Sequence, residues 1–370
     1  MTVVRRQART RWSVVVALLA VVCAALVAVT ALPVGVGRAD PGQLRERMLA
    51  AVAQPYQGYA ESIAHLQLPD LPQVSDVTAL LNGTTRIRAW YAGPQRWRVD
   101  VLGPSGERDL YQTERGLVVW DYGAGLFTEV LGEPPPVRLP RATDLLPPDL
   151  ARRLLSATAG EPIAAAPPRG VAGIDAAGLR VSVTDRTTTV AGFDVWADPA
   201  TGLPLRVEVR GRRSDRPAVT TAFSEVSLRP PAEQVLSPAP GPGTARTATG
   251  AGDLVAVLDR FAQATLPGQL AGRPRVSTGV HGVGQYGAGL STLVVLPLPP
   301  DLATGALDKA LNAGGTEVTL ARGTGAVAGN DLLTVLVAQS PSEHRSAVLA
   351  GLVDGVILKQ AADELFGNPQ

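Results

Sequence analysis

Cysteine and histidine are scarce in this sequence, which has one cysteine and three histidines among 370 residues. Cys23 lies inside an apolar run near the N-terminus, so the rest of the chain can form neither a disulfide nor a cysteine-based zinc site. The histidines, His65, His281 and His344, are far apart, and none has a second metal ligand at the usual spacing. The sequence therefore predicts no metal site.

Motifs for catalysis and for nucleotide binding are also missing. There is no G-x-S-x-G nucleophile turn, and no cysteine and histidine pair outside the apolar run. Residues 282–287 have the glycine spacing of a dinucleotide-binding loop, but they lead into an expected strand at 291–296, where such a loop would open a helix. A glycine-rich hairpin is the better interpretation. We expect a protein that is not an enzyme and has no cofactor.

The chain has no excess charge of either sign, with 34 basic and 33 acidic residues and a formal charge of +1. Residues 1–39 contain five arginines and no acid, so the chain from Asp40 onward carries a formal charge of −4. No basic stripe remains to neutralise phosphates. Nucleic acid is therefore not an expected partner.

One long apolar run is present, at residues 14–32, and four arginines precede it. Its length is greater than the roughly 7–15 residues of a signal-peptide core and close to the roughly 20 needed to span a bilayer. Gly37 and Ala39 offer the small residues that a signal peptidase requires. Residues 1–39 are thus either a cleaved signal peptide or a retained transmembrane anchor. In both cases the remaining chain is expected on the extracytoplasmic side, in the cell envelope or secreted.

The residues after position 39 predict two domains. The 39 glycines and 31 prolines favour short elements separated by turns. Residues 84–130 and 179–228 alternate between apolar and polar side chains, with turn signals every eight to twelve residues, which indicates antiparallel strands. Apolar residues at helical spacing predict three helices that cover the sheet, at 41–53, 70–82 and 149–158.

A change of composition marks the end of the first domain, which is expected to span 40–229. Residues 230–252 are rich in proline, glycine, alanine and threonine without apolar periodicity, so they are interpreted as a linker. Residues 253–370 predict a smaller α+β domain, with helices at 253–266 and 301–313, a last helix that ends at Phe366, and strands between them.

Alternation within single strands predicts a dry face and a solvated face. Trp97, Val99 and Val101 lie on one side of an expected strand, and Arg96, Arg98 and Asp100 lie on the other. The same pattern recurs at 205–210 and at 179–184. On this interpretation Arg98 is solvated, and Arg98→Ala should have little effect.

Two stretches resemble a known family. Residues 195–207, with Trp196, Asp198, Pro199 and Gly202 in order, are similar to a hairpin typical of the LolA/LppX/RseB superfamily. In physical terms Asp198–Gly202 is a turn, in which proline fixes φ and glycine supplies a positive φ. Residues 96–100 are similar to a strand of the same families. The resemblance covers about residues 41–228.

This resemblance implies an α+β fold, in which helices cover an unclosed antiparallel β-barrel that encloses an apolar cavity. It also implies that the cavity takes the acyl chain of a lipid or a lipoprotein, as in lipoprotein carriers. RseB-like members add a smaller C-terminal domain and bind an anti-sigma factor, thereby regulating an envelope-stress sigma factor, which is the alternative function. The dry-face residues expected to line the cavity are Ile87, Tyr91, Trp97, Val99, Val101, Val181, Leu205 and Val207.

Overall fold

The computed structural model describes residues 39–66, 79–103, 106–132, 138, 140–241, 243–251, 266–278, 282–312, 314–342 and 344–367. The expected signal peptide or anchor lies outside these residues, as do most of the helix expected at 70–82 and nearly all of the helix expected at 253–266. Among the residues that the structure describes, no helix is both long enough and apolar enough to cross a membrane.

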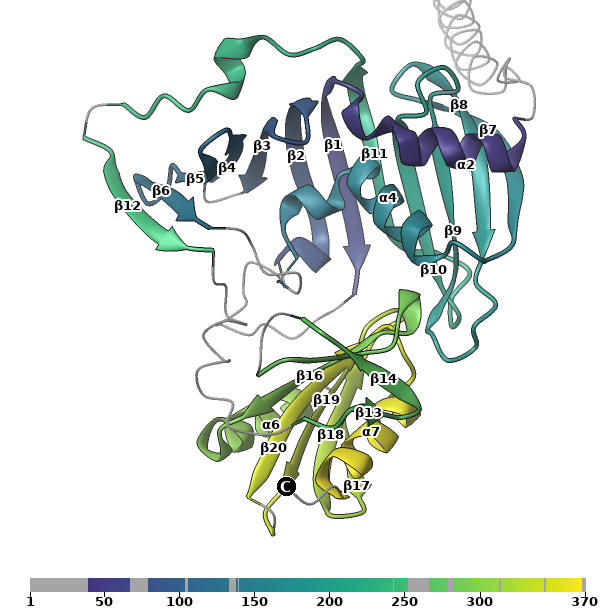
Figure 1. The fold of residues 1–370 in the computed structure, drawn as a ribbon, viewed down its shortest axis with the longest axis vertical. Helices are drawn as coiled ribbons and strands as arrows, with labels where there is room; N and C mark the ends of the chain where they lie inside the picture. Colours follow the sequence, from purple (N-terminus) through teal and green to yellow (C-terminus); the bar gives the residue numbers. More distant parts are fainter. Residues whose placement is uncertain are drawn as a thin grey trace, which may run out of the picture. The chain divides into compact units, whose positions relative to one another are not determined.

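Strands between residues 56 and 250 form an open sheet of twelve strands (Figure 1). Their order across the sheet is β12-β6-β5-β4-β3-β2-β1-β11-β10-β9-β8-β7, and all neighbours are antiparallel except β12 and β6. The bounds are β1 Tyr56–His65, β2 Asn82–Gly93, β3 Arg96–Gly103, β4 Gly106–Thr113, β5 Gly116–Asp121, β6 Leu126–Leu131, β7 Ile163–Val171, β8 Ile174–Ser182, β9 Val190–Ala197, β10 Pro204–Gly211, β11 Pro217–Ser227 and β12 Ala245–Gly250. The expected unclosed antiparallel sheet is confirmed.

Two of these strands were not expected. In β7 the segment Ala164-Ala165-Ala166-Pro167-Pro168 hides any alternation, yet β7 pairs with β8 through a turn at Ala172 and Gly173, both at positive φ. The residues interpreted as a linker contain the short helix η4 (Glu233–Leu236) and β12, whose side chains are all exposed. An exposed strand carries no apolar pattern in its sequence, so β12 is recognised only by its backbone pairing with β6. The domain bounds stay a prediction.

Helices cover one face of the sheet, called here the inner face. Figure 1 shows α2 (Pro41–Ala50) and α4 (Pro147–Ala157) in front of β8 to β11. The Asp40 carboxylate accepts a hydrogen bond from the Gln43 backbone N–H at 2.8 Å and caps α2, which continues as η1 (Ala51–Ala53). A second short helix, η3 (Ala142–Leu145), leads into α4. The helices expected at 41–53 and 149–158 are confirmed.

The hairpin that carries the family resemblance joins β9 to β10. Asp198 Oδ2 accepts hydrogen bonds from the backbone N–H and the hydroxyl of Thr201, at 2.9 and 2.6 Å. Gly202 has φ +76, and a Cβ there would lie 2.6 Å from the carbonyl carbon of Arg47 in α2. The Arg47 guanidinium donates to the Pro199 carbonyl at 2.6 Å. The motif therefore holds α2 against the sheet. Glycine is required at position 202 because φ is positive there and because a Cβ would collide with the backbone of α2.

The second sheet is smaller and antiparallel, in the order β13-β14-β15-β16-β20-β19-β18-β17. Within residues 282–287, Gly284–Tyr286 form β15, which pairs antiparallel with β16, so the hairpin interpretation is confirmed. The bounds are β13 Gln269–Leu270, β14 Arg273–Val276, β15 Gly284–Tyr286, β16 Leu293–Leu298, β17 Thr316–Leu320, β18 Gly323–Gly329, β19 Thr334–Ser340, β20 Arg345–Gly351, η5 Gly289–Ser291, α6 Pro300–Asn312 and α7 Gly355–Gly367. Its core includes Tyr286, Leu336 and Phe366, and the expected small α+β domain is confirmed.

Candidate functional site

A hollow of about 210 Å³ lies on the inner face of the large sheet, between β2 and β3 on one side and η3 and α4 on the other. Its apolar wall consists of side chains from the sheet and from the residue between η3 and α4. These are Tyr56, Ala89, Tyr91, Trp97, Val99 and Leu146. Because strand residues alternate between faces, the side chains at 97 and 99 point toward the helices.

Two stacked tyrosines form part of this wall. The rings of Tyr56 and Tyr91 are 5.1 Å apart and nearly parallel, and Phe223 meets Tyr56 edge-on at 5.6 Å. The Tyr91 hydroxyl donates to the carbonyl oxygen of Val52 at 2.6 Å. Burial raises the pKa of both tyrosines, so both rings remain neutral and hold their positions across the physiological pH range.

Three arginines and two aspartates form the polar end of the hollow. Arg138 donates to both carboxylate oxygens of Asp144 at 2.8 Å, and Arg153 reaches the same carboxylate at 2.6 Å. Burial acts to raise the pKa of Asp144, but the hydrogen bonds from Arg138 and from a backbone N–H outweigh it, so this pKa is lowered. Arg152 pairs with Asp149, whose pKa burial raises. The guanidinium groups thus outnumber the carboxylates.

The structure gathers three of the eight expected cavity residues at the hollow: Tyr91, Trp97 and Val99. Ile87, Val101 and Leu205 lie in the apolar core beside it, and the first and last of these are fully buried. Val181 and Val207 are also fully buried, and α4 packs on the strand of Val207. Much of the inner face is therefore filled by the protein's own side chains. The open space is smaller than the apolar cavity that eight lining residues would enclose.

Sequence reasoning missed the helix side of this site. Thr143, Leu146 and the charged residues of η3 and α4 face β2 and β3 across the hollow. The signal in the sequence was the group of charged residues Asp149, Arg152 and Arg153 on a helix whose other side is apolar. Alternation shows which face of a strand is dry, but it does not show which helix covers that face.

Comparison with known proteins gives structural matches alone: no family model matches the chain, and no curated protein matches it. MucB in complex with MucA(peri) is 15% identical, with a TM-score of 0.49, over 87% of this chain and 97% of that chain. The MucA/MucB complex of Pseudomonas aeruginosa is 16% identical, with a TM-score of 0.49, over 89% and 97%. A LolA superfamily protein from Nitrosomonas europaea is 13% identical, with a TM-score of 0.25, over 54% and 98%.

All of these TM-scores lie below 0.5 and the identities do not exceed 16%, so these matches assign no function to this chain.

The opposite, outer face of the large sheet differs from the expectation of a fully solvated surface. Asp100 on β3 and Asp109 on β4 are directly opposite each other and are only 1% and 0% exposed. Arg98 donates to both oxygens of Asp100, at 2.6 and 2.8 Å, and to Asp109 at 2.9 Å. The rings of Trp90 and Tyr111 lie 4.9 and 5.1 Å from its guanidinium. The expectation that Arg98 is a dispensable solvated residue is therefore wrong.

Two buried carboxyl groups beside one guanidinium cannot both be ionised without leaving a net charge in the protein interior. Burial raises the pKa of Asp100 to about 8, although Arg98 acts to lower it. Burial also raises the pKa of Asp109, against the same arginine. Because each carboxyl group influences the other and burial raises both pKa values, we expect the pair to hold a proton at neutral pH.

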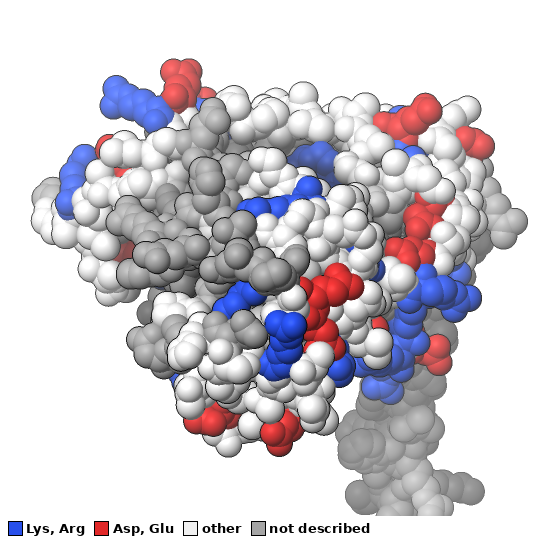
Figure 2. All heavy atoms as spheres, turned by 60° about the horizontal axis from the view of Figure 1, so that its bottom comes forward, with Lys and Arg blue, Asp and Glu red and all other residues white. Residues whose placement is uncertain are grey.

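Asp100, Glu107 and Asp109 bring carboxylate oxygens within 4.8 Å of one another, which is close enough for a metal ion. The Arg98 guanidinium already contacts the two buried members, and it stands where a cation would bind. This cluster is therefore explained by its arginine. On the face shown in Figure 2, basic and acidic side chains of the described residues are interspersed, and the basic ones form no continuous stripe.

Proposed function

We propose that this chain is a non-enzymatic, extracytoplasmic protein that binds an acyl chain of a lipid or lipoprotein in the inner-face hollow. The observation that carries the proposal is an apolar, aromatic wall that ends in a cluster of arginines and aspartates. An acyl chain with a polar head group has the same division into an apolar and a charged end. The hairpin motif that resembles lipid-binding families supports this choice.

The size of the hollow limits what enters it. A volume of 210 Å³ is about that of seven water molecules, at ~30 Å³ each. It therefore accommodates a segment of an acyl chain and leaves the remainder near the charged end. Burial of about six methylene groups at ~0.8 kcal/mol each stabilises the complex by roughly 5 kcal/mol. Fatty acids should accordingly bind in the micromolar to millimolar range.

Fluorescence titration with a dansyl-labelled fatty acid tests the proposal. Thr143 lines the hollow, so Thr143→Trp fills it and should weaken binding at least tenfold. Thr84 is exposed on β2 and adds the same bulk outside the hollow, so Thr84→Trp should bind like the unaltered protein. Equal affinity of the two variants would show that the fatty acid binds elsewhere. Absence of binding by the unaltered protein would remove the proposal.

A second candidate function is regulation, through binding of the extracytoplasmic part of an anti-sigma factor. The second sheet favours it, because RseB-like members of the resembled superfamily carry a smaller C-terminal domain. Capture of a single-pass anti-sigma factor from the host membrane by the full chain would support this role. If no membrane-anchored candidate is retained, the carrier role stands alone.

A further inference from the structure

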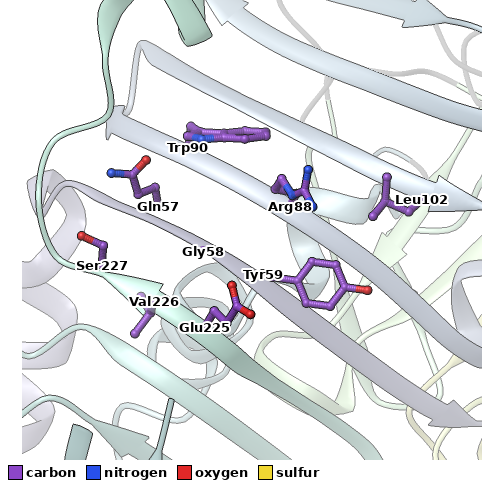
Figure 3. A pocket seen from close by; sticks show the side chains of 9 residues that line it. All are labelled: Gln57, Gly58, Tyr59, Arg88, Trp90, Leu102, Glu225, Val226 and Ser227. Atoms are coloured by element: carbon purple, nitrogen blue, oxygen red, sulfur yellow. The ribbon is translucent and has the colours of Figure 1, made fainter. Parts of the chain in front are cut away.

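A second hollow, of about 640 Å³, lies on the outer face of the large sheet (Figure 3). Residues of β1, β2, β3 and β11 line it. Gln57 and Tyr59 alternate along β1 with the inner-face residues Tyr56 and Ala60, so this hollow and the inner one lie on opposite faces of the sheet.

Trp90 presents a partly exposed indole in this hollow. One neighbour of its ring is Arg98, whose guanidinium carbon lies 4.9 Å from the ring centroid, and Arg88 lies at 6.0 Å. On its other side Trp90 is the direct partner of Gln57 on β1. Figure 3 shows Trp90, Gln57 and Arg88 around the open space. An apolar ring surrounded by polar side chains provides a surface for stacking with hydrogen-bonding groups around it.

Four of the polar side chains that line this hollow have polar atoms available to a ligand. Within the described part of the chain, the side-chain polar atoms of Gln57, Tyr59, Arg88 and Glu225 form no hydrogen bond or ion pair, and together they offer both donors and acceptors. Arg88 and Glu225 line the same hollow with opposite charges. Their sum is zero, so the hollow favours neither an anion nor a cation.

We propose that this outer-face hollow binds a neutral saccharide. A sugar ring has an apolar C–H face that stacks on an indole, and its hydroxyl groups both donate and accept hydrogen bonds. Gln57 and Arg88 would donate to these hydroxyls, and Glu225 would accept from them. Arg88 would attract a phosphate group and Glu225 would repel it, so a phosphate on the ligand would add no net attraction. A purely hydrocarbon ligand would bury these polar groups without hydrogen-bond partners, which would weaken its binding.

The test uses the full chain with maltotetraose, cellotetraose and chitotetraose as probes, in isothermal titration and tryptophan fluorescence. At least one probe should bind. Gln57→Ala and Glu225→Ala remove groups without partners in the fold, so each should leave the thermal midpoint unchanged and weaken binding about tenfold. Glu129→Ala, an exposed carboxylate on β6, is the matched control and should bind normally.

Three outcomes would overturn the proposal: none of the probes binds, both variants bind as tightly as the control, or a hexose phosphate binds more tightly than the neutral sugars. Fatty-acid binding by the Glu225→Ala variant should be unchanged, because the inner hollow is on the other face of the sheet. Loss of saccharide binding and loss of fatty-acid binding are thereby distinguished.

Discussion

The buried pair of carboxyl groups on the outer face predicts an unusual dependence of stability on pH. Asp100, opposite Asp109 and beside Arg98, has a pKa of about 8 in the folded protein, because burial disfavours its charged form. In the unfolded chain the pKa of an aspartate is about 4. The pKa of Asp100 is thus higher in the folded protein than in the unfolded chain. Protonated Asp100 therefore stabilises the fold, and this contribution to the free energy of unfolding is fully present below about pH 4. It is lost as the pH rises through about 8.

The size of the change in the free energy of unfolding follows from the number of protons that the folded and unfolded states bind. Between about pH 6 and 8 the folded protein holds one proton that the unfolded chain has released, and the free energy of unfolding falls by ~1.4 kcal/mol per pH unit at first. Integrated to pH 8, the loss is roughly 2 kcal/mol. Glu107, Tyr111 and Tyr122 also face this pair, and the two tyrosines have raised pKa values and stay neutral in this range.

The Asp100→Asn substitution replaces the shared proton by an amide that donates a hydrogen bond at any pH. Urea unfolding at half-unit steps from pH 6 to 8 should show the decline in the unaltered protein and a nearly flat profile in Asp100→Asn. Asp121→Asn is the control: a backbone N–H and Arg108 lower the pKa of Asp121, so its loss should leave the decline in place. A flat profile for the unaltered protein, or the same slope in Asp100→Asn, would refute the shared proton.

Three further substitutions test the packing. Gly202→Ala should lower the free energy of unfolding by about 2–4 kcal/mol, because φ is positive there and the new methyl group meets the Arg47 backbone; an unchanged thermal midpoint would contradict this. Arg98→Ala should destabilise the protein by about 3 kcal/mol at pH 7, measured by urea unfolding, because it leaves buried carboxyl groups without their cation. Tyr91→Phe should cost about 1 kcal/mol in the same assay through loss of the hydrogen bond to Val52, and a larger effect would mean that the ring has moved.

Period-two alternation predicted the strands well, because one face of each strand packs against an apolar layer. Leu205, Val207 and Val209 are buried while Arg206 and Glu208 are half-buried, in agreement with the alternation. The turn at Asp198 was predictable because only a few residue types fit its backbone geometry. Strand β12 was not predictable, since its pairing uses backbone groups and none of its side chains is buried.

The chemistry of the outer face was hidden for a different reason. Alternation assigned Arg98 and Asp100 correctly to the face opposite Val99, but polarity in a sequence does not reveal burial. Asp109 and Tyr111 come from the neighbouring strand and cover this position through strand pairing. Likewise, the inner hollow depends on where η3 and α4 cross the sheet, and that placement is set by tertiary packing.

Native mass spectrometry of the full chain, mixed with a fatty acid at a concentration above its expected Kd, decides whether the inner-face hollow binds an acyl chain. We expect a mass increase corresponding to one acyl lipid per chain, and its loss in Thr143→Trp while Thr84→Trp retains it. A protein that carries no acyl lipid, or a Thr143→Trp variant that carries as much as the unaltered chain, would contradict binding in the inner-face hollow.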